Sequence, residues 1–525
     1  RDTDRATNLW RQWFIDCNMF KKDGENVIQP FIAGLPKEVM FQTEDSMIEN
    51  INAYSDAGVK IDYWWIDAGW YEQGNTKGWA YTGNWTIDTE RFPTKLKAVT
   101  EACKKIGMRG GIVLWFEPEA NAFWMNSDDF DRYGIKKEWL VGYNKEKNSA
   151  PGLGTSHTFD LGNKEALNWI TGRIKTALTE SGSKIYREDF NTRFLRETWR
   201  QAEAIEADRS GMIENNCVQG HYALWDSILE LDSIEAIDSC ASGGHRLELE
   251  SMRRAIAMHP TDYNYNDLQA KHQSSYEMST WFPFTGANTG YGEYHSYTSK
   301  YILRSTYRQS MAFQVHLETF DEQTKAVLRN GEQEWRGINK YFYDDIYELT
   351  KNTASANEWY AYGYLNGEQQ EGFALVFKHS GEYAPESQSI RLKGLNASDT
   401  YEITFADDKN RKITASGAEL MTVGIAMTLN EQEHSDSSDS EIIYIKRTAI
   451  GQDDDDDIAY GDVDANGTVE ATDALWALQA YVGSRQLSDS AFKAADVNLD
   501  EKVDTSDALA ILQYAVKLRD KLPIA

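Results

Sequence analysis

A short stretch near the middle of the chain, Arg187 to Asn191, places ionisable side chains at the end of an apolar run that reads as a buried strand. Charged groups in such a strand lower stability, so their presence indicates chemistry. A second carboxyl group, Asp262, follows another apolar run further along the chain. Asp189 or Asp262 alone could cap a helix or lie in a loop. Two carboxyl groups carried by different strand ends are what the hydrolysis of a glycosidic bond requires.

The region that carries these residues alternates short apolar β-rich runs with amphipathic helical segments. The expected strands are Val59–Asp67, Arg109–Phe116, Lys184–Phe190, Ser233–Cys240 and Ala255–Asp262, and the expected helices include Leu96–Ile106 and Glu165–Leu178. Nearly continuous apolar strands separated by helices indicate a parallel sheet covered on both faces. Roughly seven or eight repeats of this unit predict an α/β fold, a (β/α)8 TIM barrel over 1–337, with its catalytic residues just after the strands.

Beyond the barrel the pattern changes to an alternation of apolar and polar residues. The runs Gly372–Lys378, Ser389–Leu395, Tyr401–Ala406 and Ile442–Lys446 predict strands of an antiparallel β-sandwich over 338–448. The polar stretch Glu431–Ser440 is expected to be an exposed loop between two of them. Five successive aspartates, 453–457, repel one another, so 449–460 is expected to be an acidic linker.

The last part of the chain, 461–525, contains two similar acidic loops, each followed by a helix that opens with Asp-Ala-Leu. Oxygen-bearing side chains at positions 1, 3, 5 and 12 match the calcium loop of an EF-hand, with Asp in place of the usual Glu at position 12. The expected calcium ligands are Asp462, Asp464, Asn466, Thr468 and Asp473 in the first loop and Asp496, Asn498, Asp500, Lys502 and Asp507 in the second. Glu501 stands where the tight turn of the second loop favours glycine. One loop and one helix, repeated twice, resemble a type I dockerin, which implies two Ca²⁺ ions and a cohesin domain as partner.

Five segments of the barrel region follow one another in a characteristic order. They are Trp65–Tyr71, Leu114–Glu119, Arg187–Asp189, Cys240–Gly244 and Thr261–Tyr263. Together they resemble the motifs of glycoside hydrolase family 36, the bacterial α-galactosidases and their α-N-acetylgalactosaminidase relatives. The resemblance covers roughly 1–448 and implies a glycosidase that retains anomeric configuration and uses no cofactor for catalysis.

The resemblance also implies roles for individual residues. Asp189 matches the nucleophile and Asp262 the general acid/base of a double displacement. The implied substrate-binding residues are Asp67, Trp65, Trp115, Arg187, Asn191, Cys240 and Gly243. Asp67 corresponds to a contact with O4 and O6 of a galacto-configured sugar, and the Cys240–Gly243 loop lies near O2. The cation of Arg187 is expected to keep Asp189 ionised. Glu117 and Glu119 could be substrate contacts or satisfied residues of the barrel mouth.

The chain departs from the family's pattern around the expected sugar ring. Ala68 stands where a second Asp is common, His259-Pro260 where relatives commonly have Trp-Arg, and His245 is unusual after Gly-Gly. These departures leave the donor sugar open between galactose, N-acetylgalactosamine and galactosamine. Family members also usually carry a large β-sandwich before the barrel. Here the barrel begins almost at once, so that domain is expected to have been lost or removed.

The leading hypothesis is an exo-α-glycosidase of the α-galactosidase type. Its substrates would be plant galactosides or host glycans such as mucin and blood-group A structures. A galactosyltransferase of the same fold and a noncatalytic sugar-binding subunit carried by the dockerin are the alternatives. The dockerin implies an extracellular, secreted protein of a cellulosome-like assembly, although the chain carries no signal peptide.

The bulk composition argues against other classes of function. With 83 Asp and Glu against 54 Lys and Arg, the formal net charge is −29, which disfavours nucleic acid and anionic membranes as partners. The 4 cysteines lack CxxC spacing, so neither a zinc site nor a disulfide framework is expected. No apolar run is long enough for a membrane span. The first residue is Arg rather than Met, which indicates a processed or truncated chain.

Overall fold

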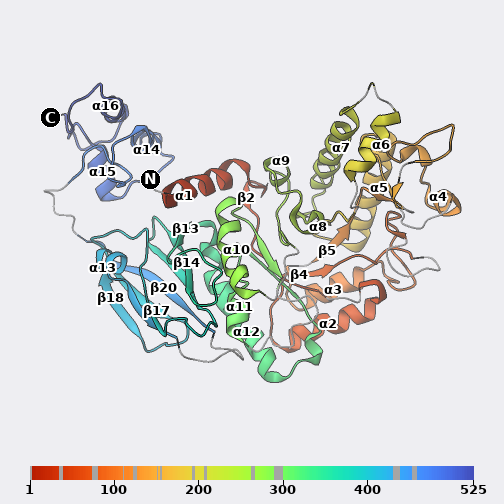
Figure 1. Cartoon of the computed structure of the whole chain (residues 1–525), viewed down its shortest axis with the longest axis horizontal. Coiled ribbons are helices and arrows are strands. Elements are labelled where there is room, and N and C mark those ends of the chain that lie inside the picture. Colours follow the sequence, from red (N-terminus) through yellow and green to blue (C-terminus); the bar gives the residue numbers. More distant parts are fainter. Residues whose placement is uncertain are drawn as a thin grey trace. The chain divides into compact units, whose positions relative to one another are not determined.

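The structure is a computed structural model of the chain. It describes residues 3–34, 39–73, 81–109, 111–121, 127–150, 152–153, 156–191, 195–205, 208, 210–261, 267–288, 299–429, 438–451 and 458–524. The chain forms two compact units, whose elements are labelled in Figure 1. One unit comprises 1–365, 372–390 and 426–443, and the other comprises 366–371, 391–425 and 444–525.

The first unit is built on parallel strands that close into a barrel. Seven strands form one sheet, namely β3 (Phe31–Gly34), β4 (Tyr63–Ile66), β5 (Gly111–Phe116), β9 (Ile185–Glu188), β10 (Ala236–Ser239), β11 (Gly286–Asn288) and β12 (Ser310–Gln314), in the spatial order β10-β9-β5-β4-β3-β12-β11. The pair Ile256 and Ala257 closes the ring, because Ile256 bridges Asp238 of β10 and Ala257 bridges Thr285 next to β11, both in parallel. The predicted (β/α)8 barrel is therefore confirmed.

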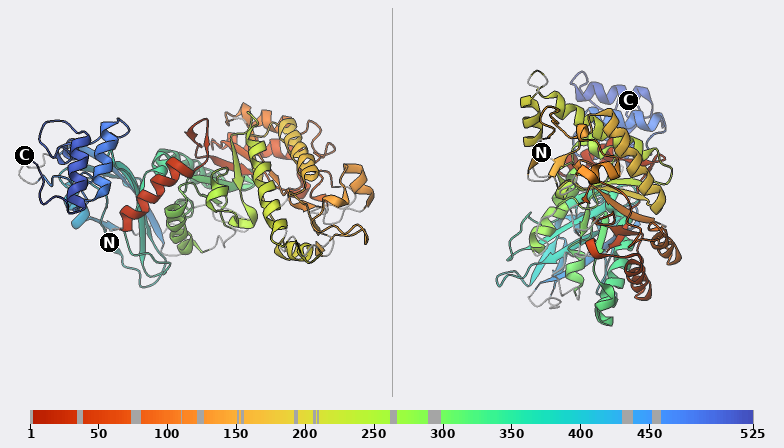
Figure 2. Two further views of the ribbon diagram at one scale, coloured as in Figure 1. Left: turned by 90° about the horizontal axis from the view of Figure 1, so that it is seen from above. Right: turned by 90° about the vertical axis from the view of Figure 1, so that its right-hand side faces the viewer.

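The barrel strands are apolar because they are covered on both faces. Every residue of β4, β5, β9 and β10 is buried. The main covering helices are α2 (Glu44–Asp56), α3 (Lys97–Lys105), α5 (Lys164–Ser181), α7 (Met212–Leu229), α10 (Leu268–Trp281) and α12 (Glu322–Ile338). Contacts join α2 to α3, α3 to α5 and α5 to α7, so that neighbouring helices follow one another around the strands (Figure 2).

Helix α5 shows how local sequence sets the ends of such an element. The side chain of Asn163 accepts hydrogen bonds from the backbone N–H groups of Glu165 and Ala166, which otherwise have no partner in the first turn. At the other end Gly182 adopts a left-handed conformation, with φ of +72°, and its N–H returns to the last turn. The helices predicted at Leu96–Ile106 and Glu165–Leu178 correspond to α3 and α5.

Shorter elements complete the first unit. They are α1 (Thr3–Trp13), β1 (Lys21–Lys22), β2 (Glu25–Asn26), β6 (Ala120–Asn121), α4 (Ser127–Tyr133), β7 (Gly152–Leu153), β8 (Ser156–Thr158), α6 (Leu195–Ile205), α8 (Ala241–Gly244), α9 (Leu249–Met252) and α11 (Lys300–Arg304), with 3₁₀ turns at Val39–Phe41, Lys137–Trp139, Leu317–Thr319 and Asn339–Tyr343 and a π-helical turn at Phe14–Asn18. The short β6, β8 and β7 form a small antiparallel sheet between β5 and α5 in the sequence.

After the barrel the chain forms antiparallel sheets. Strands β13 (Asp345–Glu348), β14 (Trp359–Asn366), β15 (Glu371–Lys378), β20 (Asp439–Ala449), β17 (Thr400–Phe405) and β18 (Lys412–Ser416) form a sheet in that order, and β16 (Ser387–Ile390) pairs with β19 (Ile425–Thr428). Alternate residues of β17 are buried, as expected for a strand with one covered face. Short helix α13 (Gly417–Thr422) follows β18. Most of the expected loop Glu431–Ser440 lies outside the described residues, and its last two residues begin β20.

The C-terminal part contains α14 (Ala471–Tyr481), α15 (Asp489–Ala495) and α16 (Thr505–Ala515). Helices α14 and α16 pack on each other around a small core that includes Val463, Ala477, Val497 and Ile511. The predicted pair of loop–helix units is confirmed. The short α15, which the sequence did not predict, lies between them and is capped at its start by the Ser488 side chain, which accepts from Ala491 N–H.

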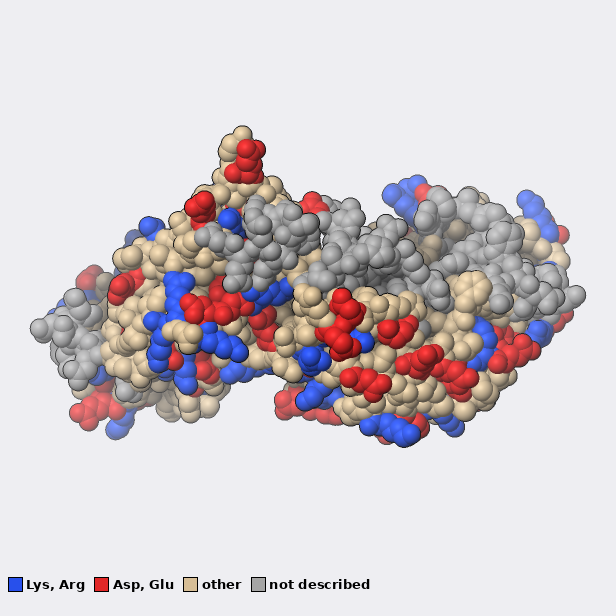
Figure 3. Space-filling model, turned by 90° about the horizontal axis from the view of Figure 1, so that it is seen from below, with Lys and Arg blue, Asp and Glu red and all other residues tan. Residues whose placement is uncertain are grey.

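The surface agrees with the mixed composition of the chain. On the face drawn in Figure 3, acidic and basic side chains are interspersed over the described residues. None of the described helices has the length and apolar character needed to cross a membrane. All four cysteines are free thiols.

Candidate active site

Asp189 follows directly after β9, at the carboxyl ends of the barrel strands. Its Oδ1 accepts hydrogen bonds from the backbone N–H groups of Phe190 (2.7 Å) and Ser242 (2.8 Å). Its Oδ2 accepts from Trp115 Nε1 (3.1 Å) and Asn191 Nδ2 (2.9 Å). Four donors from three separate strand ends therefore fix the orientation of this carboxylate.

Arg187 supplies a positive charge that acts on Asp189. Its guanidinium forms an ion pair with the buried Asp238 of β10 and lies 4.0 Å from the centre of the Trp65 ring. Asp238 also accepts a hydrogen bond from the backbone N–H of Met258 (2.8 Å). Burial opposes ionisation of Asp189, but the charge of Arg187 and the donated hydrogen bonds hold the pKa of Asp189 below its ordinary range. Asp189 is therefore an ionised carboxylate in a mostly buried setting.

Glu117 follows β5 and is completely buried beside Asp189. Its carboxyl oxygens accept hydrogen bonds from the backbone N–H of Asn191 and from Asn191 Nδ2 (3.5 Å). Burial, and then the charge of Asp189, raises the pKa of Glu117 to about 8. Asn191 thus connects an ionised carboxylate to a neighbouring carboxyl group that is mostly protonated at neutral pH.

The remaining expected substrate contacts surround the same point. Asp67 follows β4; burial raises its pKa against the opposing charge of Arg187. Its Oδ1 accepts the backbone N–H of Ala68 (2.7 Å). Cys240 follows β10, and its Sγ accepts the N–H of Gly243 (3.4 Å). Burial raises the pKa of the Cys240 thiol well above its usual value, so the sulfur stays protonated.

The barrel mouth gathers most of the residues singled out from the sequence. Asp67, Trp65, Trp115, Arg187, Asp189, Asn191, Cys240 and Gly243 lie at the ends of four consecutive barrel strands. Asp262, the expected acid/base, lies outside the described residues. His259 is buried near the end of the closing segment, with its ring edge-on to Trp65 at 6.2 Å. His245 closes a turn, because its Nδ1 donates to the carbonyl oxygen of Ala241 (2.8 Å).

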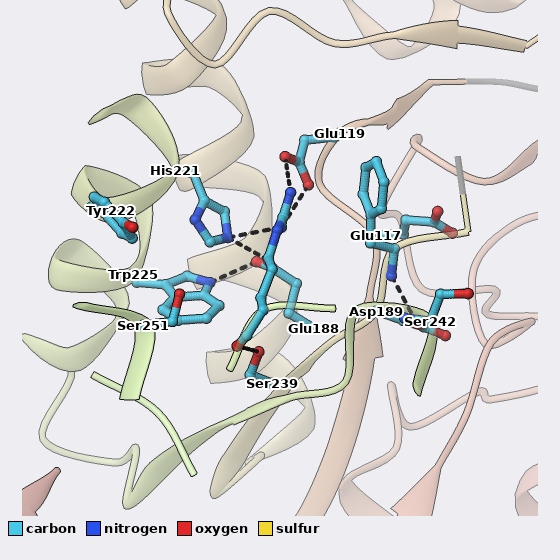
Figure 4. A network of polar contacts seen from close by, with 12 residues as sticks. Glu117, Glu119, Glu188, Asp189, His221, Tyr222, Trp225, Ser239, Ser242 and Ser251 are labelled. Atoms are coloured by element: carbon cyan, nitrogen blue, oxygen red, sulfur yellow. Dashed lines mark hydrogen bonds and ion pairs between the residues drawn. The ribbon is translucent and has the colours of Figure 1, made fainter. Parts of the chain in front are cut away.

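A second buried network around Glu188 was not predicted from the sequence. Glu188 Oε1 accepts from His221 Nε2 (2.5 Å) and Arg246 Nη1 (2.9 Å), and Oε2 accepts from Tyr186 Oη and Trp225 Nε1 (both 2.7 Å), as Figure 4 shows for His221 and Trp225. A signal was present, since Glu188 interrupts a buried strand and His221 and Trp225 lie four residues apart on one face of a helix. The acid of β10 that pairs with Arg187, Asp238, carried a similar signal.

The two C-terminal loops share one pattern of hydrogen bonds. Asp462 accepts the N–H groups of Asn466 (3.0 Å) and Gly467 (2.7 Å). In the second loop Asp496 accepts those of Asp500 (3.1 Å) and Glu501 (2.8 Å) in the same way. The last acid of each loop, Asp473 or Asp507, accepts N–H groups from its own loop. Carboxylate oxygens of Asp462, Asp464 and Asp473 all lie within 4.8 Å of one another.

Glu501 differs from its counterpart in the first loop. Gly467 has a φ of +86° and Glu501 a φ of +64°, so both occupy the left-handed region. This region is easy for glycine and unfavourable for a residue with a Cβ. The side chains at position 7, Thr468 and Lys502, differ without consequence for this pattern, because that position of an EF-hand loop supplies its backbone carbonyl.

Comparison with known families decides the relationship of the chain. The family described as Melibiase matches residues 5–321, the glycosyl hydrolase family 36 C-terminal domain matches 359–445, and the dockerin type I domain matches 451–514. The chain belongs to the melibiases of glycoside hydrolase family 36. The resemblance drawn from the five barrel motifs and from the acidic repeat is confirmed.

Individual members of the family are distant relatives. The chain is 27% identical to an α-galactosidase of Escherichia coli over 246 residues, which cover 46% of this chain and 31% of the relative. It is 20% identical to α-galactosidase AgaA of Geobacillus stearothermophilus over 406 residues, which cover 76% of this chain and 52% of the relative. The chain therefore spans about half the length of AgaA and about a third of the length of the Escherichia coli relative.

Solved structures support the fold. A variant of AgaA in complex with 1-deoxygalactonojirimycin matches with a TM-score of 0.70 at 15% identity, covering 85% of this chain and 59% of that one. The α-galactosidase of Lactobacillus brevis matches with a TM-score of 0.68 at 17% identity, covering 86% of this chain and 59% of that one. The barrel and the antiparallel region thus share the fold of this family.

Proposed function

We propose that the chain is a retaining exo-α-glycosidase that hydrolyses terminal α-linked, galacto-configured sugars. The observation that carries the proposal is the setting of Asp189, an ionised carboxylate fixed by four donors at the mouth of a melibiase barrel. A buried carboxylate held in one orientation with a lowered pKa is suited to attack an anomeric carbon. The relatives compared above, which are α-galactosidases, give the class of sugar.

In the proposed mechanism Asp189 and Asp262 divide the work. Asp189 attacks C1 and forms a covalent glycosyl-enzyme while Asp262 gives its proton to the departing oxygen. Water then attacks C1 from the side that the leaving group vacated, Asp262 takes the water's proton, and Asp189 is released as a carboxylate. The second displacement restores the original anomeric configuration. Retention of this kind implies carboxyl groups about 5–5.5 Å apart.

The residues around Asp189 are proposed to bind the sugar. Asp67, Trp65, Trp115, Arg187, Asn191, Cys240 and Gly243 would line the pocket for the terminal ring. Asp67 would contact O4 and O6, and the Cys240–Gly243 turn would lie near O2. Ala68, His245 and His259 depart from the family's pattern in this region. The proposed substrates therefore include, besides α-galactosides, the α-N-acetylgalactosaminides and galactosaminides of host glycans such as mucin and blood-group A structures.

The C-terminal module is proposed to bind Ca²⁺ in both loops and to dock onto a cohesin domain. The carboxylates of Asp462, Asp464 and Asp473 are close enough to share one hard cation, and the second loop repeats the same backbone pattern. Leu475 and Leu478 of α14 and their repeat counterparts Leu509 and Leu512 of α16 are exposed, which suits a protein partner. Such a module fits a secreted enzyme of a cellulosome-like assembly.

We propose four parts for the chain in keeping with this reading. They are the catalytic barrel (1–337), the C-terminal β-sandwich (338–448), the acidic linker (449–460) and the dockerin (461–525). The barrel and sandwich would act on the glycan, and the linker would allow the dockerin to anchor the enzyme.

A panel of aryl α-glycosides that differ at C2 and C4 tests the proposed activity. Cleavage of the galacto-configured members with release of the α-anomer, followed by proton NMR, is the expected result. The panel also ranks galactose, N-acetylgalactosamine and galactosamine as donors. Release of the β-anomer would refute retention. Binding without cleavage of any member would refute the enzyme, and transfer to an added sugar in preference to water would indicate a transferase.

The role of Asp189 has a test of its own. Replacement by glycine should lower kcat on the order of 10⁴-fold or more, as removal of a catalytic nucleophile does elsewhere. Azide should partly restore turnover of a substrate with a good leaving group, because the small anion can enter the space of the lost carboxylate. Wild-type activity of Asp189→Gly would eliminate the assigned nucleophile.

A further inference from the structure

The turn that supplies one donor to Asp189 has an unfavourable backbone. Its four residues, Ala241, Ser242, Gly243 and Gly244, all have positive φ, from +48° to +96°. The left-handed region is poorly suited to Ala and Ser, which carry a Cβ. Yet this conformation brings Ser242 N–H to 2.8 Å from Asp189 Oδ1. Such a conformation persists only where the surroundings hold it.

The end of this turn is anchored by Arg246. Its Nη1 donates to Glu188 Oε1 (2.9 Å) and to Glu119 Oε2 (3.0 Å), and its Nη2 donates to Glu119 Oε1 (2.5 Å). The guanidinium carbon lies 4.8 Å from the centre of the Phe190 ring. Arg246 therefore connects the loop after β5 with the end of β9 and covers the residue that follows Asp189.

The acids that hold Arg246 are themselves fixed. The side chain of Glu188 is 1% exposed and that of Glu119 5% exposed. Glu188 is also bound by His221 and Trp225 of α7, and Figure 4 shows these groups in one view with Asp189 and Ser242. Removal of one partner from a buried charged network leaves the others uncompensated. The network is therefore a rigid support rather than a surface ion pair.

We propose that Arg246 is a positioning residue for the nucleophile. By joining Glu119 to Glu188 it holds the Ala241–Gly244 turn so that Ser242 N–H stays on Asp189. The inference rests on the proposed function of Asp189. It gives a role to Glu119, Glu188 and Arg246, which the mechanism itself does not use.

The hydrogen bond from Ser242 also affects how activity depends on pH. Among the described residues, Asp189 interacts electrostatically with four charged or titratable groups. They are Arg187 on its own strand, Asp67 after β4, Glu117 after β5 and Cys240 after β10. Arg187 and the hydrogen bond from Ser242 are among the influences that lower the pKa of Asp189. Loss of the Ser242 donor raises the pKa of Asp189. The acidic limb of kcat/KM then moves to higher pH.

Arg246→Lys in the full chain tests the role, since lysine keeps the charge but cannot bridge both acids bidentately. The expected result is a fall in kcat of about 10- to 100-fold, the size of a lost hydrogen bond to a charged group. KM should change less, and the acidic limb should shift upward. Arg254→Lys is the matched control, because Arg254 also bridges two acids, Asp226 and Glu250 (both 2.6 Å), outside the barrel mouth. Its profile should equal that of the wild type.

A double-mutant comparison separates positioning from a general structural effect. In the azide-rescued Asp189→Gly background, Arg246→Lys should lower kcat by less than about threefold, because the carboxylate that accepts the hydrogen bond from Ser242 is gone. An equal loss in both backgrounds would overturn the proposal. If Asp189→Gly alone retained full activity, the proposed role of Asp189 would fail first, and that outcome is visible before Arg246 is changed.

A second variant covers the case in which Arg246→Lys does not fold. Glu188→Gln keeps the size of the side chain and removes one of the charges that Arg246 bridges. It should shift the acidic limb in the same direction by a smaller amount. Near-UV circular dichroism shows whether Glu188→Gln is folded. If the folded variant had the kcat and the acidic limb of the wild type, the proposed support of Asp189 by this network would be refuted.

Discussion

At the residue scale, Asp189 illustrates how a carboxylate is kept charged away from water. Burial alone would raise its pKa, but Arg187 and four donors oppose that effect. Two of the donors are backbone N–H groups and two are the side chains of Trp115 and Asn191. The side-chain donors can be removed one at a time without altering the chain path.

Trp115→Phe removes the indole N–H and keeps an aromatic ring. Loss of a hydrogen bond to a charged group should lower kcat/KM by about 10- to 100-fold. The pKa of Asp189 should rise, so the acidic limb of kcat/KM should move to higher pH. Trp85→Phe is the control, since Trp85 is a buried neighbour whose Nε1 has no hydrogen-bond partner among the described residues. A shift of equal size in both variants would show that the indole N–H of Trp115 is not the cause.

The raised pKa of Glu117 predicts that the stability of the barrel depends on pH. Its folded-state pKa of about 8 lies above the unfolded value of about 4.3, so the folded state binds the proton more tightly. This contribution is complete below the unfolded pKa and is lost as the pH rises toward 8, at up to about 1.4 kcal/mol per unit. The melting temperature of the barrel transition should therefore fall between pH 6 and 8.5. Glu117→Gln should reduce this fall, whereas Glu165→Gln, at an exposed site, should leave it unchanged.

At the element scale, closure of the barrel depends on a close backbone contact. A Cβ on Gly286 of β11 would lie 1.9 Å from the carbonyl oxygen of Met258, next to the closing pair Ile256 and Ala257. Only glycine allows the two segments to approach so closely. The residues that follow Met258 lead toward Asp262, so this contact also bears on the expected acid/base.

Gly286→Ala should therefore destabilise the barrel by about 2 kcal/mol or more, through steric displacement of a buried segment. Gly172→Ala is the matched control, because Gly172 is exposed in α5 and its added Cβ would meet no atom within 4 Å. That change should stabilise the helix by about 0.5–1 kcal/mol. Differential scanning calorimetry of the two variants measures both effects. If Gly286→Ala were as stable as the wild type, the described closure of the barrel would be contradicted.

The two acidic loops both have a left-handed backbone at position 6, but the residue there is Gly467 in the first loop and Glu501 in the second. The variant Glu501→Gly tests how much this difference matters for Ca²⁺ binding. Glycine removes the cost of the left-handed conformation at Glu501, which is about 1 kcal/mol, so affinity of the second loop for Ca²⁺ should rise about fivefold. Gly467→Ala should weaken the first loop by the converse argument. Calcium titration by calorimetry on the full chain checks both. A lower affinity of the second loop for Ca²⁺ in Glu501→Gly would show that the Glu501 side chain itself assists binding.

The elements themselves were largely predictable, because long apolar runs such as those of β4, β5 and β9 have little alternative to a buried parallel strand. Strands β3, β11 and β12 were not predicted; β3 and β11 contain glycine and span only four and three residues. The ordered motifs identified the ends of the strands around Asp189. The bridge made by Arg246 was not predictable in the same way, because it joins the loop after β5, the last residue of β9 and the segment after β10, and depends on how they pack.

At the scale of the whole molecule, chemistry and attachment occupy separate parts of the sequence. The residues proposed for the active site lie between Trp65 and Asp262, whereas the acidic loops begin at Asp462, beyond the run of five aspartates. The C-terminal helices pack around their own small core. The residues proposed for the two sites come from separate stretches of the sequence, so the two activities should respond independently to metal removal.

Chelation tests that independence. Removal of Ca²⁺ leaves the acidic side chains of each loop uncompensated, so α14 and α16 should lose their packing and cohesin binding should disappear. Hydrolysis of an aryl α-galactoside should stay within about twofold of its initial rate, and added Ca²⁺ should restore only the binding. Asp473→Ala and Asp507→Ala provide metal-site variants for comparison. A hydrolysis rate that follows the calcium concentration would contradict the separation.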